Sequence, residues 1–272
     1  MVDLFDVSGK IAVVTGGGGI LCSEMAIALA TRDVKVAILD INEKEAKAVA
    51  DRITAEGGEA IAIATNVLDK ASLERARDLV IGNYGTVDIL INGAGGNKPE
   101  ATASDSMSFF DIPADAIQWV FNLNIIGTVL PTQVFGKIMA ERGEGVIINM
   151  SSMAAFKPLT RTVAYSAAKA AVSNFTQWMA VHFSQNYSTN IRVNALAPGF
   201  FLTNQNYYLL VDKETGEPTD RGRQIIGHTP MGKYGTPEDL IGTLLWLVSD
   251  ASSFVNGVVV PVDGAFSAFS GV

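Results

Sequence analysis

The chain has 272 residues, of which 48% are hydrophobic and 18% are charged, and its formal net charge is −8 at pH 7. This length and apolar content allow one large core, so we expect residues 1–272 to form a single domain. The acidic balance argues against a nucleic-acid binder and against docking on anionic lipid. We expect a cytoplasmic protein, because no apolar run approaches the roughly 20 residues that span a bilayer and residues 1–10 do not resemble a signal peptide. The single cysteine fits a reducing compartment.

Short apolar runs alternate with segments of helical spacing along the whole chain. Most of the runs lack polar alternation, which is typical of strands covered on both faces. We expect seven strands, at 11–16, 35–40, 59–65, 88–92, 145–150, 191–197 and 257–263. Helix candidates lie between them, for example at 43–56, where Ala46, Val49 and Ile53 share a face. The pattern predicts an α/β fold: a Rossmann-type, doubly wound parallel sheet with helices on both faces.

Two segments interrupt this alternation, at about 97–113 and 204–235. Both are long, polar and broken by glycine and proline, and both follow strand ends. Open parallel sheets bind ligands at the carboxyl ends of their strands, and long irregular segments there are often binding loops. We therefore expect both segments to be substrate loops.

A run of four glycines, in TGGGGILC at 15–22, connects the first strand to the first predicted helix. Backbone amides at a helix N-terminus can receive a pyrophosphate, and Cβ atoms at Gly16, Gly18 or Gly19 would obstruct it. Asp40 ends the second strand 24 residues after Gly16, close to the separation of about 20 residues expected of an acid that binds the adenosine ribose. A carboxylate there would repel a 2′-phosphate, so the sequence favours NAD over NADP. A turn without a ligand and an ordinary solvated acid are the alternatives.

Three side chains further along point to proton-transfer chemistry. Tyr165 and Lys169 are four residues apart in an alanine-rich segment, so on a helix they share one face. A nearby ammonium favours the phenolate, so we expect Lys169 to lower the pKa of Tyr165 from its ordinary value of about 10. Ser152 ends the preceding strand and could hydrogen-bond a substrate oxygen beside the phenol.

Six motifs in chain order resemble the short-chain dehydrogenase/reductase family, and the resemblance covers nearly the whole chain. They are TGGGGILC at 15–22, NGAG at 92–95, LNIIGT at 123–128, NMSS at 149–152, YSAAK at 165–169 and NALAPGFFLT at 194–203. The resemblance implies an NAD-dependent oxidoreductase. It implies that Tyr165 is the general acid or base, that Lys169 holds the nicotinamide ribose, and that Ser152 positions the substrate. It also implies that Asn124 holds a water in a proton relay.

The same resemblance implies a set of cofactor-binding residues. The set is Gly16, Gly18, Gly19, Ile20, Asp40, Asn66, Val67, Asn92, Gly93, Ala94, Tyr165, Lys169, Pro198, Gly199 and Thr203. Ile20 and Cys22 replace later glycines of the family's turn, so we expect a shifted but open turn, with Cys22 as a packed small residue and not a redox group. Asn66 stands where the family usually has an aspartate.

Within the family the chain most resembles sugar-acid members of the D-mannonate oxidoreductase (fructuronate reductase) type, with gluconate 5-dehydrogenase types close by. A sugar acid needs a cation for its carboxylate, and Arg161 and Lys98 are the candidates, although each could be a solvated loop residue. We expect no metal site, because His and Cys are sparse and His228 has no partner motif. The apolar C-terminus fits subunit contacts, and the family implies a homotetramer. A tail that folds over its own core is the alternative.

Three other functions were weighed against this one. A 3-oxoacyl-thioester reductase would favour NADPH and a basic patch for a carrier protein, which Asp40 and the acidic balance oppose. A Rossmann protein that senses NAD without turnover would not need Asn124, Ser152, Tyr165 and Lys169 together. A Rossmann methyltransferase would not need the Tyr–Lys pair.

Overall fold

The structure is a computed structural model that describes residues 3–203 and 207–271. Seven strands form one parallel sheet in the order β3-β2-β1-β4-β5-β6-β7, as predicted. The strands are β1 (Ile11–Thr15), β2 (Lys35–Asp40), β3 (Ala60–Ala64), β4 (Ile89–Asn92), β5 (Gly145–Met150), β6 (Ile191–Pro198) and β7 (Val259–Val262). The order reverses between β1 and β4, and ligands bind open α/β sheets at such a switch point.

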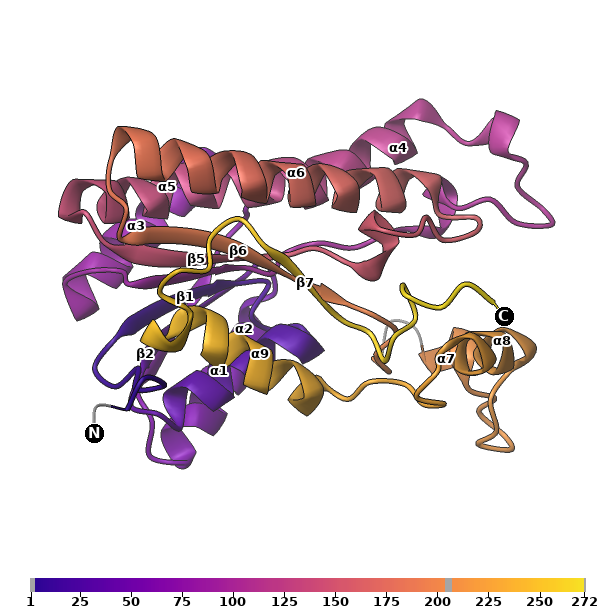
Figure 1. Cartoon of the computed structure of the whole chain (residues 1–272), viewed down its shortest axis with the longest axis horizontal. Coiled ribbons are helices and arrows are strands. Elements are labelled where there is room, and N and C mark those ends of the chain that lie inside the picture. Colours follow the sequence, from indigo (N-terminus) through magenta and orange to yellow (C-terminus); the bar gives the residue numbers. More distant parts are fainter. Residues whose placement is uncertain (1–2, 204–206, 272) are drawn as a thin grey trace.

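Helices cover both faces of the sheet (Figure 1). One layer holds α1 (Ile20–Ala30), α2 (Glu43–Ala55) and α9 (Ile241–Val248), and the other holds α3 (Lys70–Tyr84), α5 (Gly127–Arg142) and α6 (Val163–Asn186). Successive residues of β1 face opposite layers: Ala12 and Val14 pack toward α1, whereas Ile11 and Val13 pack toward α3 and α5. This burial on both faces explains the uninterrupted apolar runs in the sequence.

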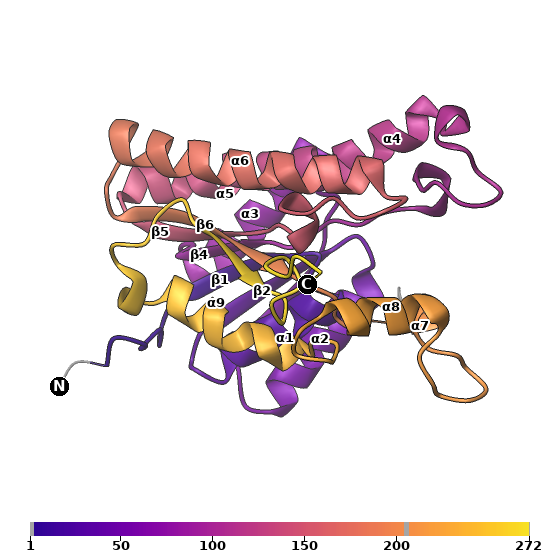
Figure 2. The same ribbon diagram turned by 45° about the vertical axis from the view of Figure 1, so that its right-hand side comes forward.

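Two projections extend beyond the carboxyl ends of the strands, at the right of Figures 1 and 2. One contains residues 97–113, mostly irregular, and α4 (Ala114–Phe121), which leads through a π-helical turn (Asn122–Ile126) into α5. The other contains α7 (Tyr207–Leu210) and α8 (Asp220–His228). The expectation that 204–235 is one irregular loop is therefore wrong. Thr219 caps α8 by accepting a hydrogen bond from Gly222 N, and Leu210, Val211 and Ile225 form a small apolar cluster beneath it. Asn204 and Gln205, at the start of the second predicted substrate loop, lie outside the described residues.

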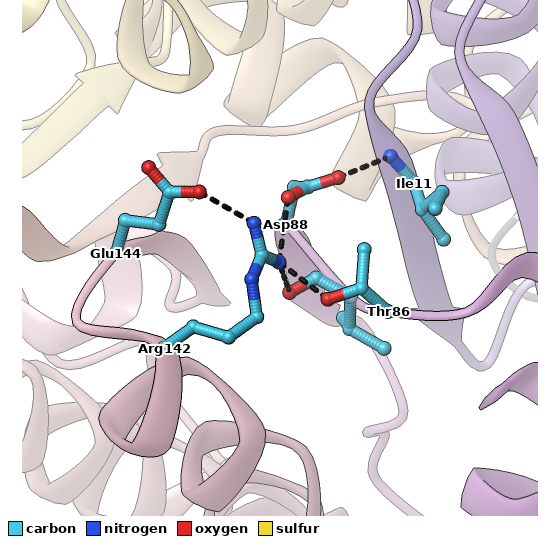
Figure 3. Close-up of polar contacts among 6 residues, drawn as sticks. Ile11, Thr86, Asp88, Arg142 and Glu144 are labelled. Carbon is cyan, nitrogen blue, oxygen red and sulfur yellow. Dashed lines mark hydrogen bonds and ion pairs between the residues drawn. The ribbon is translucent and has the colours of Figure 1, made fainter.

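A cluster of paired charges lies at the opposite, amino-terminal edge of the sheet (Figure 3). Arg142, the last residue of α5, donates to Asp88 Oδ1 at 2.8 Å and also to Glu144 and the Thr86 hydroxyl. The other oxygen of Asp88 accepts the backbone N–H of Ile11 at 2.8 Å. The cluster therefore connects the end of α5 to the starts of β1, β4 and β5.

No helix in the described parts of the chain is long and apolar enough to cross a membrane. The C-terminal segment packs on its own chain: Phe266 and Phe269 contact the ring of His228 at 4.7 and 5.1 Å between centroids. This packing accounts for part of the apolar tail.

Candidate active site

The glycine run forms a tight turn between β1 and α1. Gly16 has a φ of +62°, and a Cβ there would lie 2.8 Å from the backbone N and Cα of Ala94. Gly19 caps α1 without a side-chain hydrogen bond, and the first turn of α1 holds no acidic residue. The amides of Gly17, Gly18 and Gly19 donate to the Leu39 carbonyl, Asp40 Oδ2 and the Gly16 carbonyl, so the amides that no side-chain cap covers are those at the start of α1, beginning at Ile20. The arrangement fits the pyrophosphate of a dinucleotide.

Asp40 lies directly beside this turn, as its spacing predicts. Its Oδ2 accepts the backbone N–H of Gly18 at 3.0 Å, and its Oδ1 accepts that of Asn42 at 2.9 Å. Two backbone donors thus fix the orientation of the carboxylate between the glycine turn and the start of α2. Its remaining lone pairs could accept ribose hydroxyls.

Cys22 is a packed core residue of α1, as predicted. It is 5% exposed, and a Cβ at Gly93 would lie 2.1 Å from its Sγ, so the thiol occupies the space that Gly93 leaves. Burial raises the pKa of Cys22 to about 12, which keeps the thiol neutral. Ile20, the other residue that replaces a glycine of the family's turn, begins α1 and is half-buried.

The segment after β4 is held against the glycine turn. The Thr15 hydroxyl accepts the backbone N–H groups of Gly93 at 3.1 Å and Ala94 at 3.4 Å. The side chain of Asn92 points instead into the core, where its Nδ2 donates to Thr132 Oγ1 at 2.9 Å and Asn149 Oδ1 at 2.8 Å. Asn92 can therefore line a cofactor only through its backbone, because strand alternation turns its side chain toward α5.

Tyr165 and Lys169 lie one turn apart on α6, as predicted, with Lys169 Nζ 5.6 Å from the centroid of the Tyr165 ring. Lys169 is 5% exposed and donates to the Met150 carbonyl at 2.7 Å. Ser152 follows β5, is 7% exposed and makes a hydrogen bond with the Tyr165 phenol. The three side chains predicted from separate motifs therefore meet at the carboxyl end of β5.

Asn124 joins this group from the π-helical turn. Its Nδ2 donates to the carbonyls of Gly96 at 2.7 Å and Val120 at 2.8 Å, and its Oδ1 accepts Gly96 N–H at 3.2 Å. A Cβ at Gly95 would lie 2.8 Å from Asn124 Oδ1 and 3.1 Å from Lys169 Nζ. Gly95 and Gly96 thus let the backbone pass between Asn124 and Lys169. The sequence interpretation missed this role, although the second glycine of NGAGG could have indicated it.

The ionisation of Tyr165 differs from the expectation. Burial raises the pKa of Tyr165, and the hydrogen bond with Ser152 only partly opposes this rise. Burial also lowers the pKa of Lys169 to about 8. The predicted lowering of the Tyr165 pKa by Lys169 is therefore wrong for this arrangement. The physical reason is that Nζ lies over the phenol ring, 5.6 Å from its centroid, and donates to the Met150 carbonyl, so burial dominates the shift of the Tyr165 pKa.

The remaining residues of the predicted cofactor set lie at the ends of β3 and β6. Asn66 is exposed and its Oδ1 accepts Leu68 N–H at 2.9 Å, while Val67 is buried. Pro198 ends β6, and a Cβ at Gly199 would lie 2.7 Å from Asp263 Cα, so this turn also needs glycine. The carbonyl of Thr203 accepts Tyr207 N–H at 2.8 Å.

Of the two predicted substrate cations, Lys98 lies in the projection that carries residues 97–113, and Arg161, just before α6, contacts it. Arg161 has a φ of +72°, its carbonyl accepts Ala103 N–H at 2.9 Å, and its guanidinium lies 3.2 Å from Asp105 Oδ1. Lys98 Nζ lies 5.4 Å from the centroid of the Trp119 ring. Within the described residues no group of three or more His, Cys, Asp or Glu side chains could hold a metal ion.

Comparison with known proteins identifies the family. A sequence profile described as short chain dehydrogenase matches residues 10–213. The chain is 51% identical over 276 residues to the uncharacterized oxidoreductase UxuB of Bacillus subtilis (strain 168), a match that covers 98% of both chains. A 2-dehydro-3-deoxy-D-gluconate 5-dehydrogenase of Dickeya dadantii (strain 3937) is 32% identical over 269 residues, which are 98% of this chain and 99% of that one.

A solved structure indicates the same family. It comes from Haemophilus influenza, contains bound NAD and is provisionally described as a D-mannonate oxidoreductase. It matches this fold with a TM-score of 0.92 at 50% identity, and the match covers 98% of each chain. The six motifs, their meeting at one edge of the sheet and these matches agree, and the chain belongs to the short-chain dehydrogenase family.

Proposed function

We propose that the protein transfers a hydride between NAD and a secondary alcohol or ketone of a sugar acid, with D-mannonate and D-fructuronate as the pair. The observation that carries the chemistry is the convergence of Ser152, Tyr165 and Lys169 with Asn124 at one strand end. The choice of NAD and of the sugar acid is supported by the relative at 50% identity that was solved with NAD.

The cofactor would lie across the switch point between β1 and β4. The amides at the start of α1, beginning at Ile20, would receive its pyrophosphate and Asp40 its adenosine ribose, with Asn66, Val67, Gly93 and Ala94 nearby. The segment formed by Pro198, Gly199 and Thr203 would face the nicotinamide. When bound, NAD supplies the hydride acceptor for oxidation and, in its reduced form, the hydride donor for reduction.

The proton is handled by the side chains of this chain. Tyr165 donates it to the substrate oxygen in reduction and accepts it in oxidation, while the Ser152 hydroxyl orients that oxygen. Because burial raises the pKa of Tyr165, the phenol stays protonated at neutral pH and is prepared to act as an acid. Lys169 and Asn124 lie next in line, on either side of Gly95, and could pass a proton onward through water. Reduction should therefore be favoured at neutral pH, and oxidation should rise as the pH increases.

Arg161 is our candidate for the carboxylate of the sugar acid, with Lys98 as a second cation. The guanidinium already pairs with Asp105, but this ion pair is exposed, with side-chain exposures of 51% and 97%. Such pairs contribute about 0–1 kcal/mol, so a substrate carboxylate could replace Asp105 at little cost. The left-handed backbone of Arg161 also fits a functional position, because such strain tends to collect at binding sites.

The test is a substrate panel read by absorbance of the reduced nicotinamide. Hexuronates and hexonates, including D-fructuronate and D-mannonate, are compared with uncharged ketones and alcohols. We expect Arg161→Ala to raise the KM for the hexuronate by roughly tenfold and to leave the uncharged ketone within twofold. Arg75→Ala, which removes an exposed arginine of α3 paired with Asp69, is the matched control. Equal effects of Arg161→Ala on both substrates would remove Arg161 from the site.

A second sugar-acid reaction is favoured by the 32% identical relative, a 2-dehydro-3-deoxy-D-gluconate 5-dehydrogenase. Oxidation at C5 of a gluconate would use the same Ser152 and Tyr165. The panel separates the two, because the preferred pair has the larger kcat/KM.

We also propose that the protein works in the cytoplasm as a homotetramer. The exposed side chains of Trp178 and Val181 on α6, at 57% and 55%, support a subunit contact on that helix. Light scattering measures the assembly, and a monomer in solution would contradict it.

A further inference from the structure

We propose that Glu45, on the first turn of α2, is a second residue that makes the protein reject NADP. The inference rests on the proposed use of NAD at the glycine turn. It goes beyond Asp40, which is the acid that the sequence pattern itself indicates.

The position of Glu45 follows from the contact between α2 and the glycine turn. A Cβ at Gly18 would lie 2.7 Å from Glu45 Cβ, 3.1 Å from Asp40 Oδ2 and 3.3 Å from Ala46 N. Any side chain at position 18 would therefore push α2 away. Gly18 thus brings Glu45 into contact with the turn that is expected to hold the pyrophosphate, on the side where Asp40 lies.

The usual structural role of a glutamate at this position is already filled by another residue. A glutamate at the third position of a helix often accepts the backbone N–H of the N-cap residue. Here the N-cap is Asn42, and its N–H donates to Asp40 Oδ1 at 2.9 Å. Over residues 3–203 and 207–271 the Glu45 side chain makes no hydrogen bond or ion pair. Within the described residues its carboxylate is therefore not engaged by another group, and its Cβ lies beside Gly18.

The surrounding charge makes this acid effective against a phosphate. Residues 40–45 hold three carboxylates and one ammonium, that of Lys44. The next cation along α2, Lys47, is neutralised by Asp51, whose two oxygens both lie 2.6 Å from Nζ. The 2′-phosphate that distinguishes NADP adds a charge of nearly −2 at the ribose. It would be repelled by Glu45 as well as by Asp40.

The experiment measures dissociation constants of NADH and NADPH for the full-length protein, by energy transfer from tryptophan to the nicotinamide. Glu45→Gln keeps the length and polarity of the side chain but removes its charge. We expect it to tighten NADPH binding on the order of fivefold and to change NADH binding by less than twofold. Asp40→Asn should tighten NADPH more but should also weaken NADH, because Asp40 is the residue that would bind the ribose.

Glu43→Gln is the matched control, because Glu43 is an exposed glutamate of the same helical turn that does not contact Gly18. It removes the same helix-dipole interaction and the same net charge, so an effect of either on NADPH binding would appear in both variants. In about 1 M salt, where the Debye length is about 3 Å, the difference between wild type and Glu45→Gln should shrink.

The outcomes distinguish the role of Glu45 from the proposed use of NAD. If wild-type protein binds NADH but Glu45→Gln leaves the ratio of the two dissociation constants unchanged, the role of Glu45 is overturned and the use of NAD stands. An equal gain in Glu43→Gln would overturn it too, because the effect would then be one of net charge. If wild-type protein binds NADPH more tightly than NADH, the proposed cofactor itself is wrong. Glu45→Ala repeats the charge removal should the glutamine variant not fold.

Discussion

The two ends of the parallel sheet differ in how their cationic side chains are paired. At the amino-terminal edge, the guanidinium of Arg142 has two carboxylates, a hydroxyl and a carbonyl as partners (Figure 3). At the carboxyl edge, Lys169 is buried, and within the described residues it has a carbonyl as partner but no carboxylate. A buried cation without a counter-charge destabilises the fold, and a group kept at such a cost is a candidate for function. The amino edge therefore stabilises the sheet, while the carboxyl edge keeps reactive groups in place.

The largest effect should come from the phenol at the carboxyl edge. Tyr165→Phe removes the group that we propose transfers the proton, while keeping the ring that lies against Lys169. We expect kcat to fall by about 10²–10⁴-fold, because a positioned acid or base contributes a factor of that size. The NADH dissociation constant and the melting temperature should stay close to wild type. Turnover within tenfold of wild type in steady-state assays would show that the proton is transferred elsewhere.

A somewhat smaller effect should follow from distorting the glycine turn itself. Gly16→Ala places a methyl group 2.8 Å from the Ala94 backbone in a left-handed conformation, so the turn must shift. We expect NADH binding to weaken by at least tenfold, measured by energy transfer from tryptophan. Gly82→Ala on α3 is the matched control, because a Cβ there meets no atom within 4 Å. If both variants bind NADH like wild type, the cofactor does not occupy this turn.

Substitutions at the amino-terminal edge of the sheet should change the stability of the protein and not its activity. Asp88→Ala removes the carboxylate that joins Arg142 to the backbone N–H of Ile11 and leaves both donors without it. We expect a loss of about 1–3 kcal/mol in the free energy of unfolding, read as a lower urea midpoint. Asp78→Ala, which breaks an exposed pair with Arg77, should lose less than 1 kcal/mol. A drop in kcat that exceeds the drop in folded protein would contradict this separation of the two edges.

The sequence predicted the fold and the meeting of the catalytic side chains because both follow from local patterns. Apolar runs without alternation indicate a parallel sheet, and the carboxyl ends of such strands share an edge, so Ser152 and Tyr165 had to lie near one another. The direction of side chains and the state of charges depend on tertiary packing. Asn92 therefore turned out to point into the core, and burial rather than Lys169 determines the shift of the Tyr165 pKa. The prediction for Arg161 rested on its charge and on its position one turn before Tyr165, and only the fold placed Asp105 beside it.

The smallest expected effect is one on the free energy of unfolding, and it tests the same comparison between the two ends of the sheet. Burial lowers the pKa of Lys169 to about 8 in the folded protein, whereas an exposed lysine titrates near 10.5. Below pH 8 both states carry the proton, so the folded state bears the full penalty of a buried charge. Between pH 8 and 10.5 the unfolded chain binds more protons, and the penalty is relieved as the pH rises.

We therefore expect Lys169→Met to lose activity but to be more stable than wild type at pH 7. The net gain in the free energy of unfolding should be about 1 kcal/mol, after the loss of the hydrogen bond to the Met150 carbonyl is subtracted. The difference in unfolding free energy between variant and wild type should shrink from pH 7 to pH 10 in urea titrations. Lys137→Met, an exposed lysine on α5, should show no such pH dependence. If the methionine variant is less stable than wild type at pH 7, then Lys169 contributes to the fold as Arg142 does. The two edges of the sheet would then follow the same rule.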